Sequence, residues 1–121
     1  KNLKWNKGHL LHQLTYFVGK VNFYYMDKKN TKKVAVMNTG DTMYISPYTP
    51  HTFASRDENL DAHIIAVTFT GKITNEVQNH LQGFEKNNLK NFLSFNSLKS
   101  LIDRKLKDNC LNYETFEKII K

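Results

Sequence analysis

The chain is poor in cysteine, in arginine and in long apolar runs. The single cysteine among its 121 residues, Cys110, excludes an internal disulfide and a zinc site built from several cysteines, and it fits a reducing cytosol. No apolar run approaches the roughly 20 residues of a membrane-spanning helix, so we expect a cytoplasmic protein without a membrane partner. Arg56 and Arg104 are its only arginines, and the lysines behind the net charge of +7 are scattered. This pattern favours solvated lysines over a nucleic-acid surface, and we expect no nucleic-acid partner.

Proline is as scarce as arginine, and both prolines lie immediately before one histidine. Pro47 and Pro50 follow a Gly40-Asp41 turn and a short alternating strand, and they lead directly to His51. Because proline fixes its own φ and restricts the residue before it, the loop presents His51 with little backbone freedom. A rigid loop that presents an imidazole can hold a metal ion. The alternative is a tight turn that ends in a surface histidine, and the loop alone does not decide between them.

Residues 9–71 have the pattern of short strands separated by turns. Apolar residues alternate through residues 14–18 and 23–25, Gly19 marks a bend between them, and residues 27–33 form a polar turn. Further short strands are predicted at residues 34–37, 42–46, 52–55 and 63–70. Strands of this length with regular turn signals predict an antiparallel β-barrel or sandwich.

The pattern changes to a helical period after Gly71. Four successive groups of apolar residues recur at intervals of three and four, and the last of them is Phe116, Ile119 and Ile120. We therefore predict a β part followed by an α part: a barrel portion at residues 1–72 and a C-terminal helical segment at residues 73–121. The first candidate site residues come very early in the chain, so we expect a fragment of a longer protein or the product of a truncated gene, with either a whole or a partial barrel.

Three polar residues form a candidate metal site. His9 and Gln13 are four residues apart, so on one strand they face the same side, whereas His12 faces the other. If His9 and Gln13 line the barrel interior, His51 could reach them from the proline loop. Iron(II) oxygenases commonly use two histidines and one carboxylate, and no carboxylate stands at a suitable spacing here. The alternative from spacing alone is a barrel with polar residues that bind no metal.

The motif around His51 resembles a known family. Gly40-Asp41, Pro47 and Pro50-His51 resemble the second half of the cupin signature, which belongs to small metal-binding β-barrels. A closer resemblance is to the phosphonate-cleaving cupins, the methylphosphonate synthase and hydroxyethylphosphonate dioxygenase family. His9, Gln13 and His51 match the iron ligands of the synthase in type and separation. The dioxygenase has a glutamate six residues before its last histidine, where this chain has Ile45.

The resemblance implies an activity and further site residues. It implies an iron(II)- and O2-dependent dioxygenase that cleaves the C–C bond of 2-hydroxyethylphosphonate and releases methylphosphonate, with Fe(II) as the cofactor and no organic cofactor. Asn6 matches the family's substrate-binding asparagine, and Ile45 fills the space of the carboxylate and so influences the product. His63 could also contact the phosphonate, although a histidine at the barrel rim explains it as well. The cut edges of a partial barrel need partners, so we expect a homo-oligomer.

Other functions stay open at this point. One is hydroxyethylphosphonate dioxygenase activity, with hydroxymethylphosphonate as the product. Another is a cupin sensor or regulator with a helix-turn-helix-like tail, for which residues 97–107 and 112–120 would be the two helices. Glu114 and Glu117 in the second of these argue against DNA binding. A structural fragment that binds no metal is a further alternative.

Overall fold

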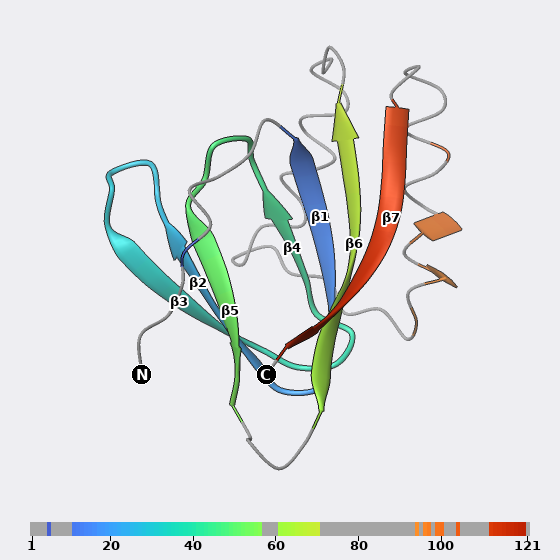
Figure 1. Ribbon diagram of the computed structural model, residues 1–121, viewed down its shortest axis with the longest axis horizontal. Coiled ribbons are helices and arrows are strands. Elements are labelled where there is room, and N and C mark those ends of the chain that lie inside the picture. The colour runs from blue at the N-terminus through green and yellow to red at the C-terminus, as the bar shows by residue number, and fades with distance from the viewer. Residues whose placement is uncertain are drawn as a thin grey trace.

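Two antiparallel sheets face each other in the computed structural model of this protein (Figure 1). The structure describes residue 5, residues 11–56, 61–70 and 112–120, and residues 94, 96, 97, 99, 100 and 104. One sheet has four strands in the order β4-β1-β6-β7, and the other has three in the order β3-β2-β5. The strands are β1 (His12–Val18), β2 (Val21–Met26), β3 (Lys32–Met37), β4 (Thr42–Ile45), β5 (His51–Ser55), β6 (Ala62–Thr70) and β7 (Asn112–Ile120).

Glycines at the turns explain where two of the strands end. Gly19 joins β1 to β2 with a φ of 86°, and Gly40 lies in the turn before β4 with a φ of 92°. Both values lie in the left-handed region that glycine adopts without steric cost. A Cβ at position 19 would also lie 3.1 Å from the Cα of Ala62, so the turn packs closely against the start of β6. The prediction of antiparallel strands is confirmed for β1 to β6.

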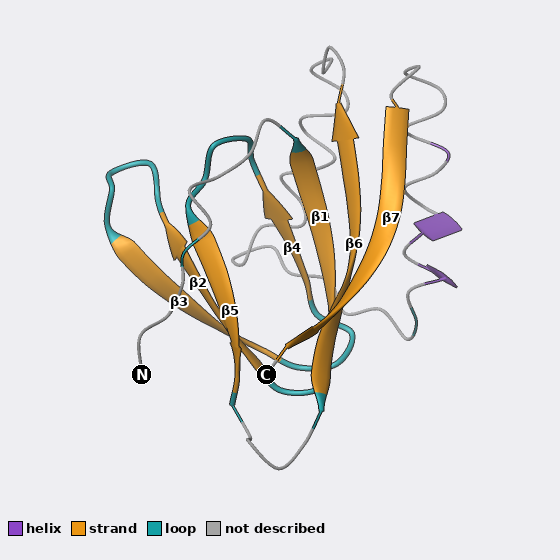
Figure 2. Cartoon of the chain, in the orientation of Figure 1, coloured by secondary structure: helices purple, strands orange, loops and turns teal. Residues whose placement is uncertain are grey.

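The predicted C-terminal helix at residues 112–120 is wrong. These residues form β7, which pairs antiparallel with β6 from Asn112 opposite Thr70 to Ile120 opposite Ala62. Tyrosine, threonine, phenylalanine and isoleucine favour strands, and the long apolar strand β6 offers an edge for them. Residues 96, 97, 99, 100 and 104 are helical, whereas residues 71–93 lie outside the described part of the chain. Strands therefore dominate the described residues (Figure 2).

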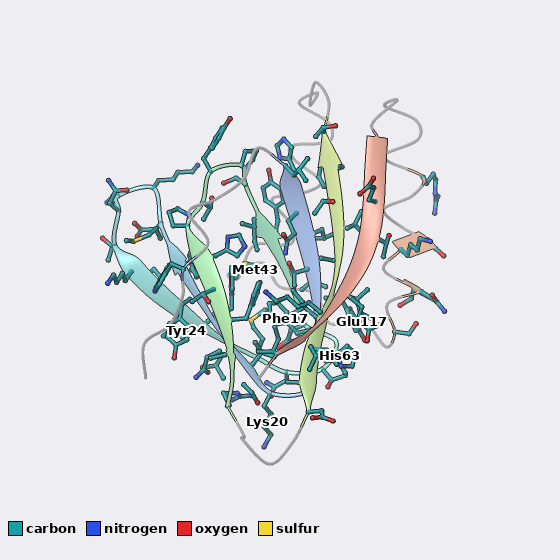
Figure 3. The ribbon with its side chains drawn as sticks, in the orientation of Figure 1. Phe17, Lys20, Tyr24, Met43, His63 and Glu117 are labelled. Atoms are coloured by element: carbon teal, nitrogen blue, oxygen red, sulfur yellow. The ribbon has the colours of Figure 1, made fainter. Side chains whose placement is uncertain are left out.

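The hydrophobic core lies between the inner faces of the two sheets. Phe17 of β1 meets Phe23 of β2 and Phe53 of β5, with ring centroids 6.0 and 5.9 Å away. Phe17 and Met43 lie between the sheets in Figure 3. These aromatic contacts join the two sheets, and they fix which residues of each strand face inward. No helix within the described residues is long and apolar enough to cross a membrane.

The hairpin loop between β2 and β3 gives a test of the fold. One carboxylate oxygen of Asp27 accepts hydrogen bonds from the backbone nitrogens of Lys29 and Thr31, each at 2.9 Å. The bond from Thr31, then that from Lys29 and the charges of Lys33 and Lys29, lower the pKa of Asp27 below its usual value. A lowered pKa stabilises the fold above the unfolded pKa, near 3.8, and this contribution is lost as the pH falls further.

We therefore expect Asp27→Asn to lose part of the pH dependence of stability. In denaturation between pH 3 and pH 6, the wild type should lose stability below about pH 4, and the variant should lose less. Asp61→Asn, at another exposed position, controls for the change in net charge. Equal pH dependence in the wild type and Asp27→Asn would contradict this role.

Candidate metal centre

The loop before His51 is a tight turn anchored at both ends. The backbone nitrogen of Thr49 donates to the carbonyl of Ser46 at 3.3 Å, and the nitrogen of Met26 donates to the carbonyl of Pro50 at 3.0 Å. Pro47 is the second residue of the turn, and Tyr48 is the third, with a φ of 62°. A positive φ at the third position is the geometry of a type II turn, which usually carries glycine there. The two prolines and the bond to β2 hold the start of β5 in place.

His51 is a buried imidazole whose Nδ1 is held by the backbone. Its side chain is 3% exposed, and its Nδ1 lies 2.8 Å from the carbonyl oxygen of Thr49. A carbonyl can only accept, so Nδ1 carries the proton and the lone pair of the neutral ring lies on Nε2. Histidines that bind metals commonly donate their other N–H to a carbonyl in this way. The rings of Phe53 and Phe23, 5.6 and 6.1 Å away between centroids, pack against the imidazole.

Gln13 is a buried amide on the inner face of the other sheet. It is 3% exposed, and it shares its face with Phe17, since both are odd-numbered residues of β1. Its Nε2 donates to the hydroxyl of Thr15 at 2.9 Å. Gln13 lies opposite Ile45 of β4 on one side and opposite Thr68 of β6 on the other.

The chain connection brings Gln13, Ile45 and His51 to one end of the barrel. Ile45 is the last residue of β4, His51 is the first of β5, and only residues 46–50 separate them. His51 faces inward with Phe53, because it lies opposite Tyr25 as Phe53 lies opposite Phe23. We call this end, with Gln13, Ile45, His51 and Thr68, the site end. It lies at the top of Figure 1, where β4 ends and β5 begins.

Two predicted site residues, Asn6 and His9, lie outside the described residues, so their roles stay predictions. Among the described residues, no group of three or more histidine, cysteine, aspartate or glutamate side chains could hold a metal ion. Within the described part, the candidate centre therefore consists of the imidazole of His51 and the amide of Gln13. The sequence interpretation also missed Thr15, although it follows Gln13 by two residues and so shares its face.

The structure does not bring His63 to the site end. On β6 it lies opposite Val18, whereas Thr68 lies opposite Gln13. A separation of five residues puts His63 on the other face of the sheet and about 16 Å along the strand. Its Nε2 lies 3.4 Å from a carboxylate oxygen of Glu117 on β7, and Figure 3 shows this pair in the lower half of the molecule. His63 is therefore left out of the site proposed below.

His12 faces away from the barrel interior, as the alternation along β1 predicts. Its Nδ1 lies 2.6 Å from the hydroxyl of Tyr44, and its ring stacks on Phe69 with centroids 5.1 Å apart. Burial lowers the pKa of His12. These contacts hold β1 against β4 and β6 behind the candidate site, so His12 supports the position of Gln13 from the outer face.

The fold is cupin-like, with two facing sheets of antiparallel strands and buried polar residues at one end of the inner faces. The chain is 53% identical over 79 residues to methylphosphonate synthase of Nitrosopumilus maritimus. This match covers 64% of the chain but only 17% of that relative, so the chain corresponds to a small part of its length. No protein-family model matches the sequence.

Solved structures of phosphonate enzymes are also similar to this chain. One is HEPD of Streptomyces albus with substrate 2-hydroxyethylphosphonate and Fe(II) bound, at a TM-score of 0.55 and 41% identity. It matches 70% of this chain and 19% of the solved chain. A second is hydroxypropylphosphonic acid epoxidase from S. wedmorenis in complex with fosfomycin, at a TM-score of 0.47 and 27% identity over 54% of this chain and 34% of that one. The sequence relative and the first structure confirm the resemblance predicted from the motif around His51.

Proposed function

We propose that this chain forms the iron-binding part of a non-haem phosphonate oxygenase of the methylphosphonate synthase type. The observation that carries the proposal is the arrangement at the site end. Gln13 is buried and lies opposite the buried Ile45 of β4. The next strand, β5, begins with the buried His51, whose Nδ1 donates to the carbonyl of Thr49. The 53% identity to methylphosphonate synthase and the fold similarity to HEPD support it independently. The domain division at residues 72 and 73, the homo-oligomer and the cytoplasmic location stay predictions.

The donor chemistry at the site end fits Fe(II). His51 offers the Nε2 lone pair and Gln13 offers an amide oxygen, and the resemblance adds His9 as the third ligand. Imidazole nitrogen suits iron. Fe(II), when bound by these residues, would bind the oxygens of the substrate and activate O2. Asn6 would donate a hydrogen bond to the phosphonate.

Ile45 fills the space beside the Gln13 amide. It is 2% exposed and lies directly opposite Gln13 on the inner face. Side chains opposite each other in an antiparallel pair have Cβ atoms about 5 Å apart, so whatever stands at position 45 lies beside the amide. An isoleucine there keeps water away and adds no negative charge. The centre would then carry one carboxylate fewer than the common set of two histidines and one carboxylate.

The resemblance to the synthase supplies the substrate, and the absence of a carboxylate at position 45 supports the choice of product. We propose 2-hydroxyethylphosphonate as the substrate, with methylphosphonate as the main product. The test is the reaction of the full-length protein with Fe(II), O2 and 2-hydroxyethylphosphonate, with the products identified by phosphorus NMR. Hydroxymethylphosphonate as the only product would overturn the assignment in favour of the dioxygenase. The regulator with a helix-turn-helix tail is not proposed, because its second helix would fall on β7.

Ile45→Glu tests the part of position 45 in the product. We expect a share of hydroxymethylphosphonate to appear beside methylphosphonate, because the new carboxylate would lie next to Gln13 at the metal. The metal-free variant should lose stability, by roughly 1–3 kcal/mol or more, because the charge is buried without a partner. Ile45→Gln has nearly the same shape without the charge and is the matched control. Products unchanged in Ile45→Glu with iron bound would contradict the role of Ile45.

A further inference from the structure

An amide ligand has an orientation problem that a carboxylate does not have. The two oxygens of a carboxylate are equivalent, so rotation by half a turn changes nothing for a metal. The amide of glutamine has one oxygen that can accept and one NH2 group that can only donate. Gln13 can therefore bind a cation in only one of its two orientations, and a neighbouring group has to favour that orientation.

Thr15 is placed to make this choice. Its hydroxyl accepts a hydrogen bond from Nε2 of Gln13 at 2.9 Å, and both side chains are buried, with 0% and 3% of their surface exposed. The residues directly opposite Thr15 are Met43 on β4 and Ala66 on β6, which are both apolar. With the amide nitrogen held toward Thr15, stereochemistry turns the amide oxygen away from it.

We propose that Thr15 is a positioning residue that holds the Gln13 amide with its oxygen toward the iron. This inference rests on the proposed function, since it gives Gln13 the role of an iron ligand. Partners that orient a ligand from behind commonly change metal affinity by 10- to 100-fold when they are removed. Thr15 would act in this way for Gln13, as the carbonyl of Thr49, 2.8 Å from Nδ1, would for His51.

Thr15→Val and Thr15→Ser separate the hydroxyl from the volume of the side chain. Valine keeps the shape of threonine and removes the hydrogen-bond acceptor, so we expect the Kd for Fe(II) to rise about 10- to 100-fold. Serine keeps the hydroxyl, so its Kd should stay within about threefold of the wild type. The probe is Fe(II) alone, titrated without oxygen into the intact protein. The visible spectrum of the Co(II)-loaded protein gives a second readout, which should shift in Thr15→Val but not in Thr15→Ser.

A double-mutant cycle shows whether Thr15 acts through Gln13. If it does, Thr15→Val should have no further effect on the Kd in a Gln13→Ala background, because the amide that it orients is gone. A general structural effect of the substitution would instead appear equally in both backgrounds. Circular dichroism of each metal-free variant confirms that it is folded.

The outcomes distinguish this inference from the proposed function. Iron binding that requires His51 and Gln13 but is unchanged in Thr15→Val overturns the inference and leaves the function standing. An equal loss from Thr15→Val with and without Gln13 also overturns it. A wild-type protein that binds no Fe(II) overturns both. A loss in Thr15→Val that serine restores, and that vanishes in the Gln13→Ala background, supports the inference.

Discussion

His51→Ala is expected to lower the affinity for Fe(II) by more than about 100-fold, since even residues behind a ligand change it by 10- to 100-fold. The substitution removes the one imidazole that the described residues place on the inner face at the site end. Its Nδ1 is engaged with the carbonyl of Thr49, so only Nε2 can bind the metal and no other atom of residue 51 can replace it. Anaerobic titration with Fe(II), together with the iron content of the purified protein, measures the loss.

His63→Ala is the matched control for this prediction. It also removes a histidine from a strand, but from the outer face of β6, where it pairs with Glu117. Its iron affinity should equal that of the wild type. Because His51 packs on Phe23 and Phe53, alanine also leaves a cavity, so His51→Gln is made in parallel to preserve volume. Iron retained by both variants at position 51, or lost in His63→Ala, would contradict the site.

Most of the strands between residues 12 and 70 could be predicted because their signals are local. Alternating apolar residues define β1 and β2, the bend between them is marked by Gly19, and the loop that Asp27 closes is polar throughout. Each signal lies within a few residues of the structure it determines. The same holds for the loop of Pro47 and Pro50, whose restriction of the backbone is a property of proline itself.

β7 could not be predicted in this way, because its conformation depends on a distant partner. Phe116, Ile119 and Ile120 are spaced by three and four residues, as on a helix, but Ile120 is 5% exposed and its neighbour Ile119 is 62% exposed. Ile119 and Ile120 follow the alternation of a strand paired with β6. The pairing joins segments more than 40 residues apart in the chain, so no local sequence pattern can predict it. Tertiary context decides between helix and strand in such cases.

The residue types of the candidate site could be predicted from the sequence, but the pairing register of the strands that carry them could not. The motif indicates Gln13, Ile45 and His51, whereas only the pairing of β1 with β4 places Ile45 directly opposite Gln13. The position of His63 depends on register too. His63 is five residues from Thr68 on β6, and an odd separation along a strand puts the two side chains on opposite faces of the sheet. Thr15 was within reach of the sequence, since a glutamine and a threonine two apart on a strand share a face, but its hydrogen bond is a property of side-chain conformation.

Phe23→Ala is expected to have the largest effect on stability. Phe23 is 1% exposed, and its ring stacks on Phe53 and Tyr25 with centroids 5.0 and 5.2 Å away. It also meets Phe17 across the core, so one ring joins both sheets. Truncation of a buried phenylalanine to alanine typically costs about 3–5 kcal/mol of unfolding free energy. Chemical denaturation of the metal-free protein measures this loss.

The same substitution should also weaken iron binding, because the ring of Phe23 packs against the imidazole of His51, with their centroids 6.1 Å apart. Val34→Ala is the control on the same sheet, since Val34 is 54% exposed and its truncation should change stability by about 0.5 kcal/mol or less. A loss below about 1 kcal/mol in Phe23→Ala would mean that the two sheets do not depend on this core. A full loss of stability with unchanged iron affinity would mean that the proline loop alone positions His51, without support from the aromatic cluster beneath it.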